Sequence, residues 1–223
     1  MHTIIETQNL KKVYRMGEVE VTALDGVSIT VNKGDFASVM GPSGSGKTTL
    51  LNLMGCLDSP SAGKVLISGR DARALPEREL DRLRLLKIGF VFQRINLIPI
   101  LTALENVELP MELAGTSPRA RRAKALQLLA AVGLSPRAGH RPAQLSAGEQ
   151  QRAGIARALA NSPDVILADE PTGNLDSKTS GEIIALLERL NRNSGQTIVL
   201  VTHNEEIGSR TDRIIRLRDG KTA

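Results

Sequence analysis

The sequence is poor in aromatic residues and in cysteine, and it has no long apolar segment. Its 223 residues include no tryptophan, one tyrosine and three phenylalanines. The single cysteine, Cys56, excludes an internal disulfide, so we expect a reducing compartment. No stretch approaches the roughly 18 consecutive apolar residues of a spanning helix, and no basic segment leads into an apolar one at the start. We therefore expect neither a transmembrane helix nor a signal peptide.

The rest of the composition is that of an ordinary globular protein. Hydrophobic residues make up 41 % and charged residues 24 %, which excludes the collagen-like and low-complexity classes. Lysine and arginine number 29 against 24 acidic residues, and the balance of +5 suits nucleic acid, anionic lipid and phosphorylated ligands alike. The basic cluster at residues 119–124 has no aromatic neighbours for base stacking. It therefore indicates a solvated helix face.

Apolar runs and helical patterns alternate along most of the chain. Runs too short for helices, bounded by glycine, aspartate, proline or lysine, predict strands at 36–40, 65–67, 88–92, 165–168 and 197–201. Helical patterns lie between several of them, at 47–57, 78–86, 118–132, 147–161 and 178–191. This alternation is typical of a parallel sheet that is covered on both faces.

Two regions depart from this alternation. In the first 35 residues the apolar side chains recur with the period of a half-buried strand, which predicts an antiparallel layer at one edge. From about residue 94 to 151 there are only helical signals and loops, and the loops contain Pro99, Pro110, Pro118, Pro136 and Pro142. We expect one α/β domain over 1–223, with a helical subdomain at about 94–151 inserted in its core and a short strand at 214–217.

The most specific motif follows the strand at 36–40. Residues 41–48 match G-x-x-x-x-G-K-[ST], between a predicted strand and a predicted helix as this motif requires. Glycines let backbone amides curl around phosphate oxygens, the helix directs its positive end at them, the lysine reaches the β and γ oxygens, and Thr48 can bind Mg²⁺. A glycine-rich turn with a solvated lysine is the alternative. The expected phosphate-binding residues are Gly41, Pro42, Ser43, Gly44, Ser45, Gly46, Lys47, Thr48 and Thr49.

A second set of candidate site residues lies where a neighbouring buried strand is predicted to end. Asp169 and Glu170 directly follow the apolar run at 165–168. Ligands of open α/β sheets collect at these strand ends, so Asp169 is a candidate Mg²⁺ ligand and Glu170 a candidate general base. Pro171 disfavours a helical conformation at Glu170, so the strand should continue into a loop. Two solvated acids are the alternative interpretation.

Residues 145–152 read Leu-Ser-Ala-Gly-Glu-Gln-Gln-Arg, and this segment strongly resembles the signature of the ATP-binding-cassette (ABC) ATPases. The resemblance covers nearly the whole chain and implies the phosphate-loop NTPase version of the α/β fold. It places Tyr14 on the adenine, Gln93 near Mg²⁺ or the attacking water, His203 at the γ-phosphate, and Ser146, Gly148 and Asp176 on the face offered to a second copy. The family's commonest form has glycine and glutamine in place of Ala147 and Glu149, to which no role is assigned.

All of these residues except Gly148 also have a purely structural interpretation. Ser146 and Glu149 form a capping-box pattern, and Asp176 precedes a predicted helix that it could cap. Tyr14 could be an amphipathic edge residue, Gln93 a polar strand end and His203 a loop histidine. Gly148 is not explained by capping, because glycine weakens a helix, and it would permit an anion to approach closely.

The resemblance also implies the working unit. Two copies would dimerise head to tail around two ATP and two Mg²⁺, hydrolyse ATP to ADP and phosphate, and drive a separate membrane permease. The segments 14–17, 94–99, 101–107 and 169–176 resemble the macrolide-efflux and lipoprotein-release group. Members of that group drive export, or extraction from the bacterial inner membrane. We expect a cytoplasmic protein held by its permease at the inner face of the plasma membrane, with no nucleic-acid partner. The alternatives are a non-transport ABC ATPase acting on nucleic acid or ribosomes, and a phosphate-loop GTPase or small-molecule kinase.

Overall fold

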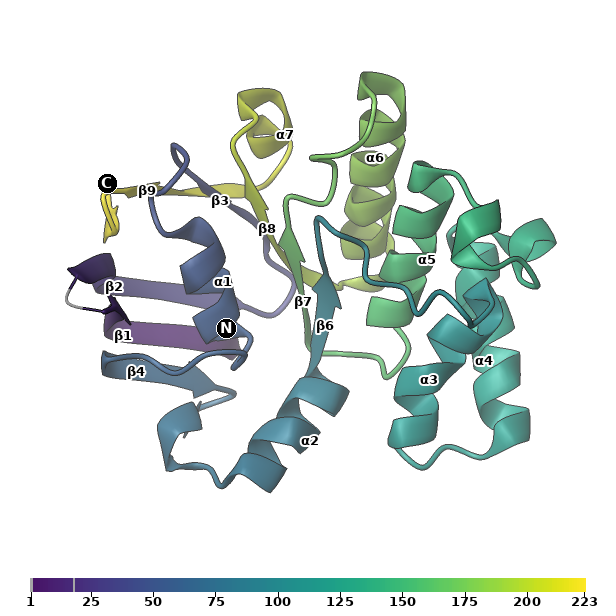
Figure 1. The fold of residues 1–223 in the computed structure, drawn as a ribbon, viewed down its shortest axis with the longest axis horizontal. Helices are drawn as coiled ribbons and strands as arrows, with labels where there is room; N and C mark the ends of the chain where they lie inside the picture. Colours follow the sequence, from purple (N-terminus) through teal and green to yellow (C-terminus); the bar gives the residue numbers. More distant parts are fainter. Residues whose placement is uncertain (1, 18) are drawn as a thin grey trace.

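The computed structural model describes residues 2–17 and 19–223 and arranges them as two sheets with surrounding helices (Figure 1). The central sheet has the strand order β10-β9-β3-β8-β7-β6 and is parallel except at β10. Its strands are β3 (Phe36–Met40), β6 (Ile88–Val91), β7 (Val165–Asp169), β8 (Thr197–Thr202), β9 (Arg213–Arg218) and β10 (Lys221–Thr222).

A second, antiparallel sheet has the order β2-β1-β4-β5. Its strands are β1 (Thr3–Met16), β2 (Val19–Asn32), β4 (Ala62–Ile67) and β5 (Arg70–Asp71). Helix α1 (Lys47–Met54) packs between the two sheets, since it contacts β1, β2 and β4 on one side and β7 and β8 on the other. The antiparallel layer is therefore a separate sheet across α1 rather than an edge of the central one.

The remaining helices cover the central sheet and extend it at one end. They are α2 (Glu77–Lys87), α3 (Ala103–Leu113), α4 (Pro118–Ala131), α5 (Ala147–Ala158), α6 (Ser177–Ser194) and α7 (Glu205–Ser209). Helices α3, α4 and α5 follow β6 and precede β7 in the chain, and they lie together at the end of the molecule away from β1 and β2 (Figure 1).

Two hydrophobic cores lie on opposite faces of the central sheet. Ile166 and Ile198 belong to the core that contains the helices α3–α6, whereas Leu167 and Val199 belong to the core that contains α1 and the antiparallel sheet. Successive side chains of a strand point to opposite faces, so strands buried on both faces are apolar throughout. This is why β7 and β8 read as unbroken apolar runs.

The α/β fold is confirmed, but further details of the prediction are wrong or missing. The strand predicted at 65–67 is part of β4, which pairs with β1 in the antiparallel sheet and not in the parallel one. The helix predicted at 47–57 ends at Met54, because Gly55 is its C-cap and lies so close to the Phe90 ring that no side chain would fit. Pro110 lies inside helix α3 rather than in a loop, and α7 was not predicted.

Helix α3 tolerates its proline because other interactions define it. Thr102 and Glu105 form a capping box at its start, and Leu104, Val107 and Met111 are buried along one face. The Pro110 carbonyl accepts a hydrogen bond of 2.9 Å from Asn161 Nδ2. Tertiary packing therefore outweighs the intrinsic effect of the proline.

Candidate active site

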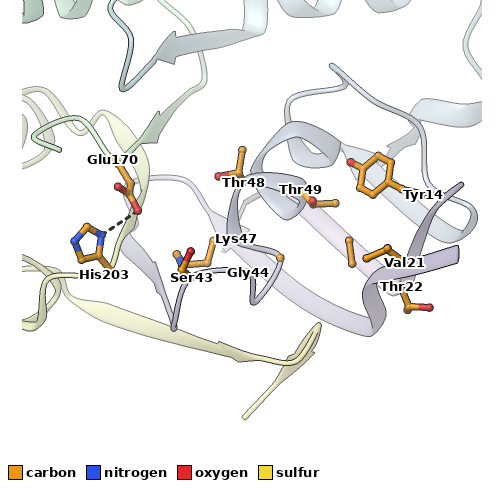
Figure 2. A pocket seen from close by; sticks show the side chains of 12 residues that line it. Tyr14, Val21, Thr22, Ser43, Gly44, Lys47, Thr48, Thr49, Glu170 and His203 are labelled. Atoms are coloured by element: carbon orange, nitrogen blue, oxygen red, sulfur yellow. Dashed lines mark hydrogen bonds and ion pairs between the residues drawn. The ribbon is translucent and has the colours of Figure 1, made fainter. Parts of the chain in front are cut away.

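The carboxyl ends of three adjacent parallel strands meet at one cavity. Met40 at the end of β3 pairs with Thr202 of β8, and Asp169 at the end of β7 pairs with Val201. The segments that follow, Gly41, His203 and Glu170, are thereby brought side by side. The cavity has a volume of about 600 Å³. It is lined by Tyr14, Val21, Thr22, Ala23, Ser43, Gly44, Gly46, Lys47, Thr48, Thr49, Glu170 and His203 (Figure 2).

The phosphate loop leads directly into α1, and its backbone conformation depends on glycine. Gly44 and Gly46 have φ of +79° and +97°, and a Cβ on Gly46 would collide with the Ala23 carbonyl. Helix α1 has no side-chain cap and no acidic residue in its first turn. Its first amides are therefore available to an anion. The Ser45 hydroxyl is also buried without a hydrogen-bond partner within the described ranges, so the loop has the features of a phosphate cradle.

The side chain of Lys47 is hydrogen-bonded back to the phosphate loop. Its side chain is 7 % exposed, and Nζ donates hydrogen bonds of 2.8 Å to the carbonyl oxygens of Gly41 and Pro42. An ammonium group has three donors, so one remains for a further oxygen. The two carbonyls thus hold a buried positive charge at the wall of the cavity, where a phosphate would be attracted.

Thr48 and Asp169 form a candidate Mg²⁺ site. Thr48 Oγ1 donates a hydrogen bond of 3.2 Å to Asp169 Oδ1. Burial raises the pKa of Asp169, and the Glu170 charge adds to this, whereas the Thr48 hydrogen bond and Lys47 oppose it. Within 2–17 and 19–223 no group of three or more His, Cys, Asp or Glu side chains could hold a metal. Mg²⁺ commonly uses one or two carboxylates together with substrate phosphates, so a hydroxyl and a carboxylate oxygen fit it.

Glu170 and His203 point toward each other on one side of the cavity, away from Tyr14 (Figure 2). Glu170 Oε1 lies 3.0 Å from His203 Nδ1. Strand β7 ends at Asp169, one residue beyond the predicted run, and Glu170 has a left-handed φ of +41°. Its N–H donates a hydrogen bond of 3.0 Å to the Val201 carbonyl. Such a conformation costs a non-glycine residue roughly 1–3 kcal/mol and is common at active sites.

Gln93 lies outside this cavity. Strand β6 ends at Val91, and the Gln93 side chain packs on Gly173, where an added Cβ would be 2.7 Å from Nε2. Its carbonyl accepts a hydrogen bond of 3.2 Å from Asn174 Nδ2. Gln93 lines a separate cavity of about 280 Å³ between the loop after β7 and the start of α5. Among the described residues no hydrogen bond joins Gln93 to Thr48 or Asp169, which bond each other.

The signature residues are also outside the cavity. Ser146 caps α5, with the reciprocal capping box to Glu149, and the Ser146 N–H lowers the pKa of Glu149. Asp176 caps α6, accepting hydrogen bonds from the Thr179 hydroxyl and N–H at 2.6 and 3.0 Å. Gly148 is buried, and a Cβ on it would overlap the Cγ2 methyl of Thr179. The close approach at Gly148 is thus one between helices of the same chain, which the sequence did not indicate.

Three lining residues of the cavity were not predicted. Val21, Thr22 and Ala23 come from β2, where Tyr14 of β1 pairs directly with Val21. Val21 is 43 % exposed, so its side chain is available to the cavity. Its signal in the sequence is its place in the alternating pattern of the first strands, but only the pairing of β1 with β2 shows that it lies beside the tyrosine.

The central parallel sheet, the phosphate loop at the end of β3 and the acidic pair at the end of β7 define a phosphate-loop nucleoside triphosphatase. The ABC transporter family model matches residues 24–173. An uncharacterised ABC transporter ATP-binding protein of Thermotoga maritima is 53 % identical over 99 % of this chain and 94 % of its own length. The macrolide export ATP-binding/permease protein MacB of Rhodopseudomonas palustris is 50 % identical over 97 % of this chain but only 33 % of its own length.

Solved structures give the same assignment. The dimeric structure of the ATP-binding cassette MJ0796, in a post-hydrolysis state bound to ADP and Pi, superposes with a TM-score of 0.90. It is 49 % identical and covers 98 % of this chain and 96 % of that one. The chain therefore belongs to the ABC transporter family, as an ATP-binding subunit that hydrolyses ATP with Mg²⁺. The comparisons do not support the alternative of an ATPase acting on nucleic acid or ribosomes.

Proposed function

We propose that two copies of this chain form a head-to-tail, ATP-driven clamp that powers export or extraction by a separate membrane permease. The observation that carries this proposal is the division of the candidate residues into two sets. Lys47, Thr48 and Glu170 line one cavity, whereas Ser146 and the Asp176 cap lie at the starts of α5 and α6, outside it. A second copy, turned head to tail, would bring the second set to the first.

The charged and polar residues at the phosphate end of the site have separate roles in this proposal. Lys47 and the amides at the start of α1 bind the phosphates, and Thr48 with Asp169 holds Mg²⁺. When bound, Mg²⁺ would neutralise charge on the phosphate oxygens. Glu170 accepts the proton of the attacking water, and His203 orients that carboxylate through Nδ1 and responds to the γ-phosphate.

The remaining roles depend on the second copy and on closure. Tyr14 stacks on the adenine. Gln93 reaches the Mg²⁺ or the water once the inserted helices at about 94–151 move toward the core. Ser146 and Gly148 meet the partner's γ-phosphate, and Asp176 communicates across the interface. Contacts that the γ-phosphate makes only in the closed state would drive the closure.

A groove beside the inserted helices is the proposed docking site for the permease. It has a volume of about 310 Å³ and includes the apolar side chains of Phe90, Phe92, Leu109 and Leu113. Leu113 is 68 % exposed, as expected of an apolar side chain that the permease would cover in the complex. None of the helices within 2–17 and 19–223 is long and apolar enough to span a membrane. The MacB relatives, in which this chain matches one third of the length, support a cytoplasmic location at the inner face of the membrane.

The proposal is tested with Glu170→Gln. The amide keeps the shape of the side chain and an oxygen for His203 but is a far weaker base, so ATP should bind and hydrolysis should stall. With ATP and Mg²⁺, light scattering should show a mass of twice 24.0 kDa. Adding Lys47→Ala to the same variant should return it to the monomer. A Glu170→Gln variant that stays monomeric at high protein and ATP concentrations would refute the clamp.

A further inference from the structure

Two side chains that do not line the cavity, those of Lys12 and Asp58, interact with the side chain of Tyr14. We propose that Lys12 and Asp58 are positioning residues, which fix the Tyr14 ring as a preformed platform for the nucleotide base. This inference rests on the proposed contact of Tyr14 with adenine. It goes beyond that contact because it assigns a function to two residues that do not line the cavity.

Lys12 is a largely buried cation with two hydrogen-bond partners and an aromatic ring beside it. Its side chain is 12 % exposed. Nζ donates hydrogen bonds of 2.6 Å to Asp58 Oδ1 and 2.8 Å to the Ser59 carbonyl. It also lies over the Tyr14 ring, 4.8 Å from the ring centroid. A buried charge is costly unless it is paired, so this arrangement constrains both the lysine and the ring that it covers.

Asp58 completes the triad through its two oxygens. Oδ1 accepts hydrogen bonds from Lys12 and from the Ser59 N–H at 2.7 Å, and Oδ2 accepts one of 2.9 Å from the Tyr14 hydroxyl. Burial raises the pKa of Asp58, but the hydrogen bonds from Lys12, Ser59 and Tyr14 outweigh it, and the pKa is lowered. The carboxylate is therefore ionised at neutral pH and bonds both other members of the triad.

The loop that carries Asp58 is itself attached to β1. The Ser61 N–H donates a hydrogen bond of 2.8 Å to the Lys11 carbonyl, and the Val13 N–H donates one of 3.0 Å to Ser61 Oγ. The same loop follows α1, whose first residue is Lys47 of the phosphate loop. The elements that would hold the phosphates and the base are thus joined by one short helix.

The triad restricts the ring in two ways. The hydroxyl is tethered to Asp58, which limits rotation and tilt, and the ammonium of Lys12 covers part of the ring surface. Tyr14 lines the cavity, whereas Lys12 does not, so we place the effect of the cation on the site in its contact with the ring. A platform that is ordered before the base arrives loses little conformational freedom on binding, which favours affinity.

The test is a double-mutant cycle in the ATPase reaction. Lys12→Met keeps the alkyl stem and Asp58→Asn keeps the shape, and each should raise KM for ATP about two- to fivefold, with a smaller effect on kcat. Tyr14→Ala should raise KM by about tenfold, the effect of losing one base stack. In the Tyr14→Ala background, Lys12→Met and Asp58→Asn should have no further effect on KM.

Two controls separate positioning from a general structural effect. Lys64→Met removes an exposed lysine on β4 that also pairs with an aspartate, Asp71 at 3.9 Å, and should leave KM unchanged. Inorganic tripolyphosphate has no base, so it should inhibit the Lys12 and Asp58 variants as well as it inhibits the wild type.

The outcomes distinguish this inference from the proposed function. If Tyr14→Ala leaves KM unchanged, the adenine contact itself is wrong. If Tyr14→Ala raises KM but the Lys12 and Asp58 variants do not, or if their effects persist undiminished without the ring, the positioning role is refuted while the adenine contact stands. Weaker inhibition by tripolyphosphate in these variants would also refute it, because the phosphate loop would then be disturbed.

Discussion

Replacing Gly148 by alanine tests whether the signature glycine is required by the fold, by the nucleotide or by both. The new Cβ would lie within 3.0 Å of the Thr179 Cγ2 methyl, a separation that real Cβ atoms do not adopt. Overpacking of this kind costs about 1–3 kcal/mol of unfolding free energy. The gain in helix propensity from glycine to alanine is about 1 kcal/mol, so we expect a net loss of up to about 2 kcal/mol.

A matched variant removes the propensity term from the comparison. Gly181 lies in helix α6 with nothing within 4 Å of an added Cβ, so Gly181→Ala should show only the gain. The difference in unfolding free energy between the two variants then measures the clash alone, about 1–3 kcal/mol. Urea denaturation followed by circular dichroism provides both values.

Thr179→Ser provides the decisive cycle. Serine lacks the Cγ2 methyl but keeps the hydroxyl that donates a hydrogen bond of 2.6 Å to Asp176 Oδ2. In that background the nearest other atoms to the new Cβ lie at 3.8 and 3.9 Å, which are ordinary contacts. Gly148→Ala should therefore become neutral or stabilising. A Gly148→Ala variant that is equally destabilised with threonine or serine at position 179 would refute the packing argument.

The ATPase rate of the double variant then separates the two roles of the glycine. If only packing requires Gly148, restoring stability with Thr179→Ser also restores hydrolysis. If a γ-phosphate must also approach the helix start, the double variant is stable and remains inactive.

Two further predictions concern the metal and the permease. Thr48→Ala should raise the Mg²⁺ concentration for half-maximal ATPase rate by at least about tenfold. Thr48→Ser should restore the wild-type value, since it is the hydroxyl that bonds Asp169. An unchanged Mg²⁺ requirement in Thr48→Ala would exclude Thr48 as a ligand. Affinity purification of the tagged chain from detergent-solubilised native membranes with ATP should recover a permease, and Leu113→Glu in the groove should reduce the yield more than Leu126→Glu, which is exposed on α4. Recovery of ribosomes or DNA in place of a permease would overturn the transport proposal.

The sequence was most informative where a short motif carries its own local geometry. The loop at 41–48 is defined mainly by its own glycines and the helix that follows, and the capping box at Ser146 needs only a residue three positions on. These features depend on neighbours in the chain. Their local structure could therefore be predicted from the sequence alone.

Sequence reasoning was wrong or silent where the answer depended on distant residues. The apolar run at 65–67 indicates a strand but not its partner. In the structure β4 pairs with β1, which is distant in the sequence. Val21 belongs to the cavity only through its pairing with Tyr14. Gly148 contacts a methyl group on another helix, and Pro110 is accepted in α3 because that helix is packed and capped. None of these contacts has a local signal.

The alternation of β7 and β8 between two cores has a consequence for how such proteins diversify. Ile166 and Ile198 pack with the helices α3–α6, and their neighbours Leu167 and Val199 pack with α1 and the antiparallel sheet. A substitution on the helical side therefore leaves the packing around α1 largely untouched. Sequence changes in one core can therefore accumulate without matching changes in the other, as long as each core keeps its own packing.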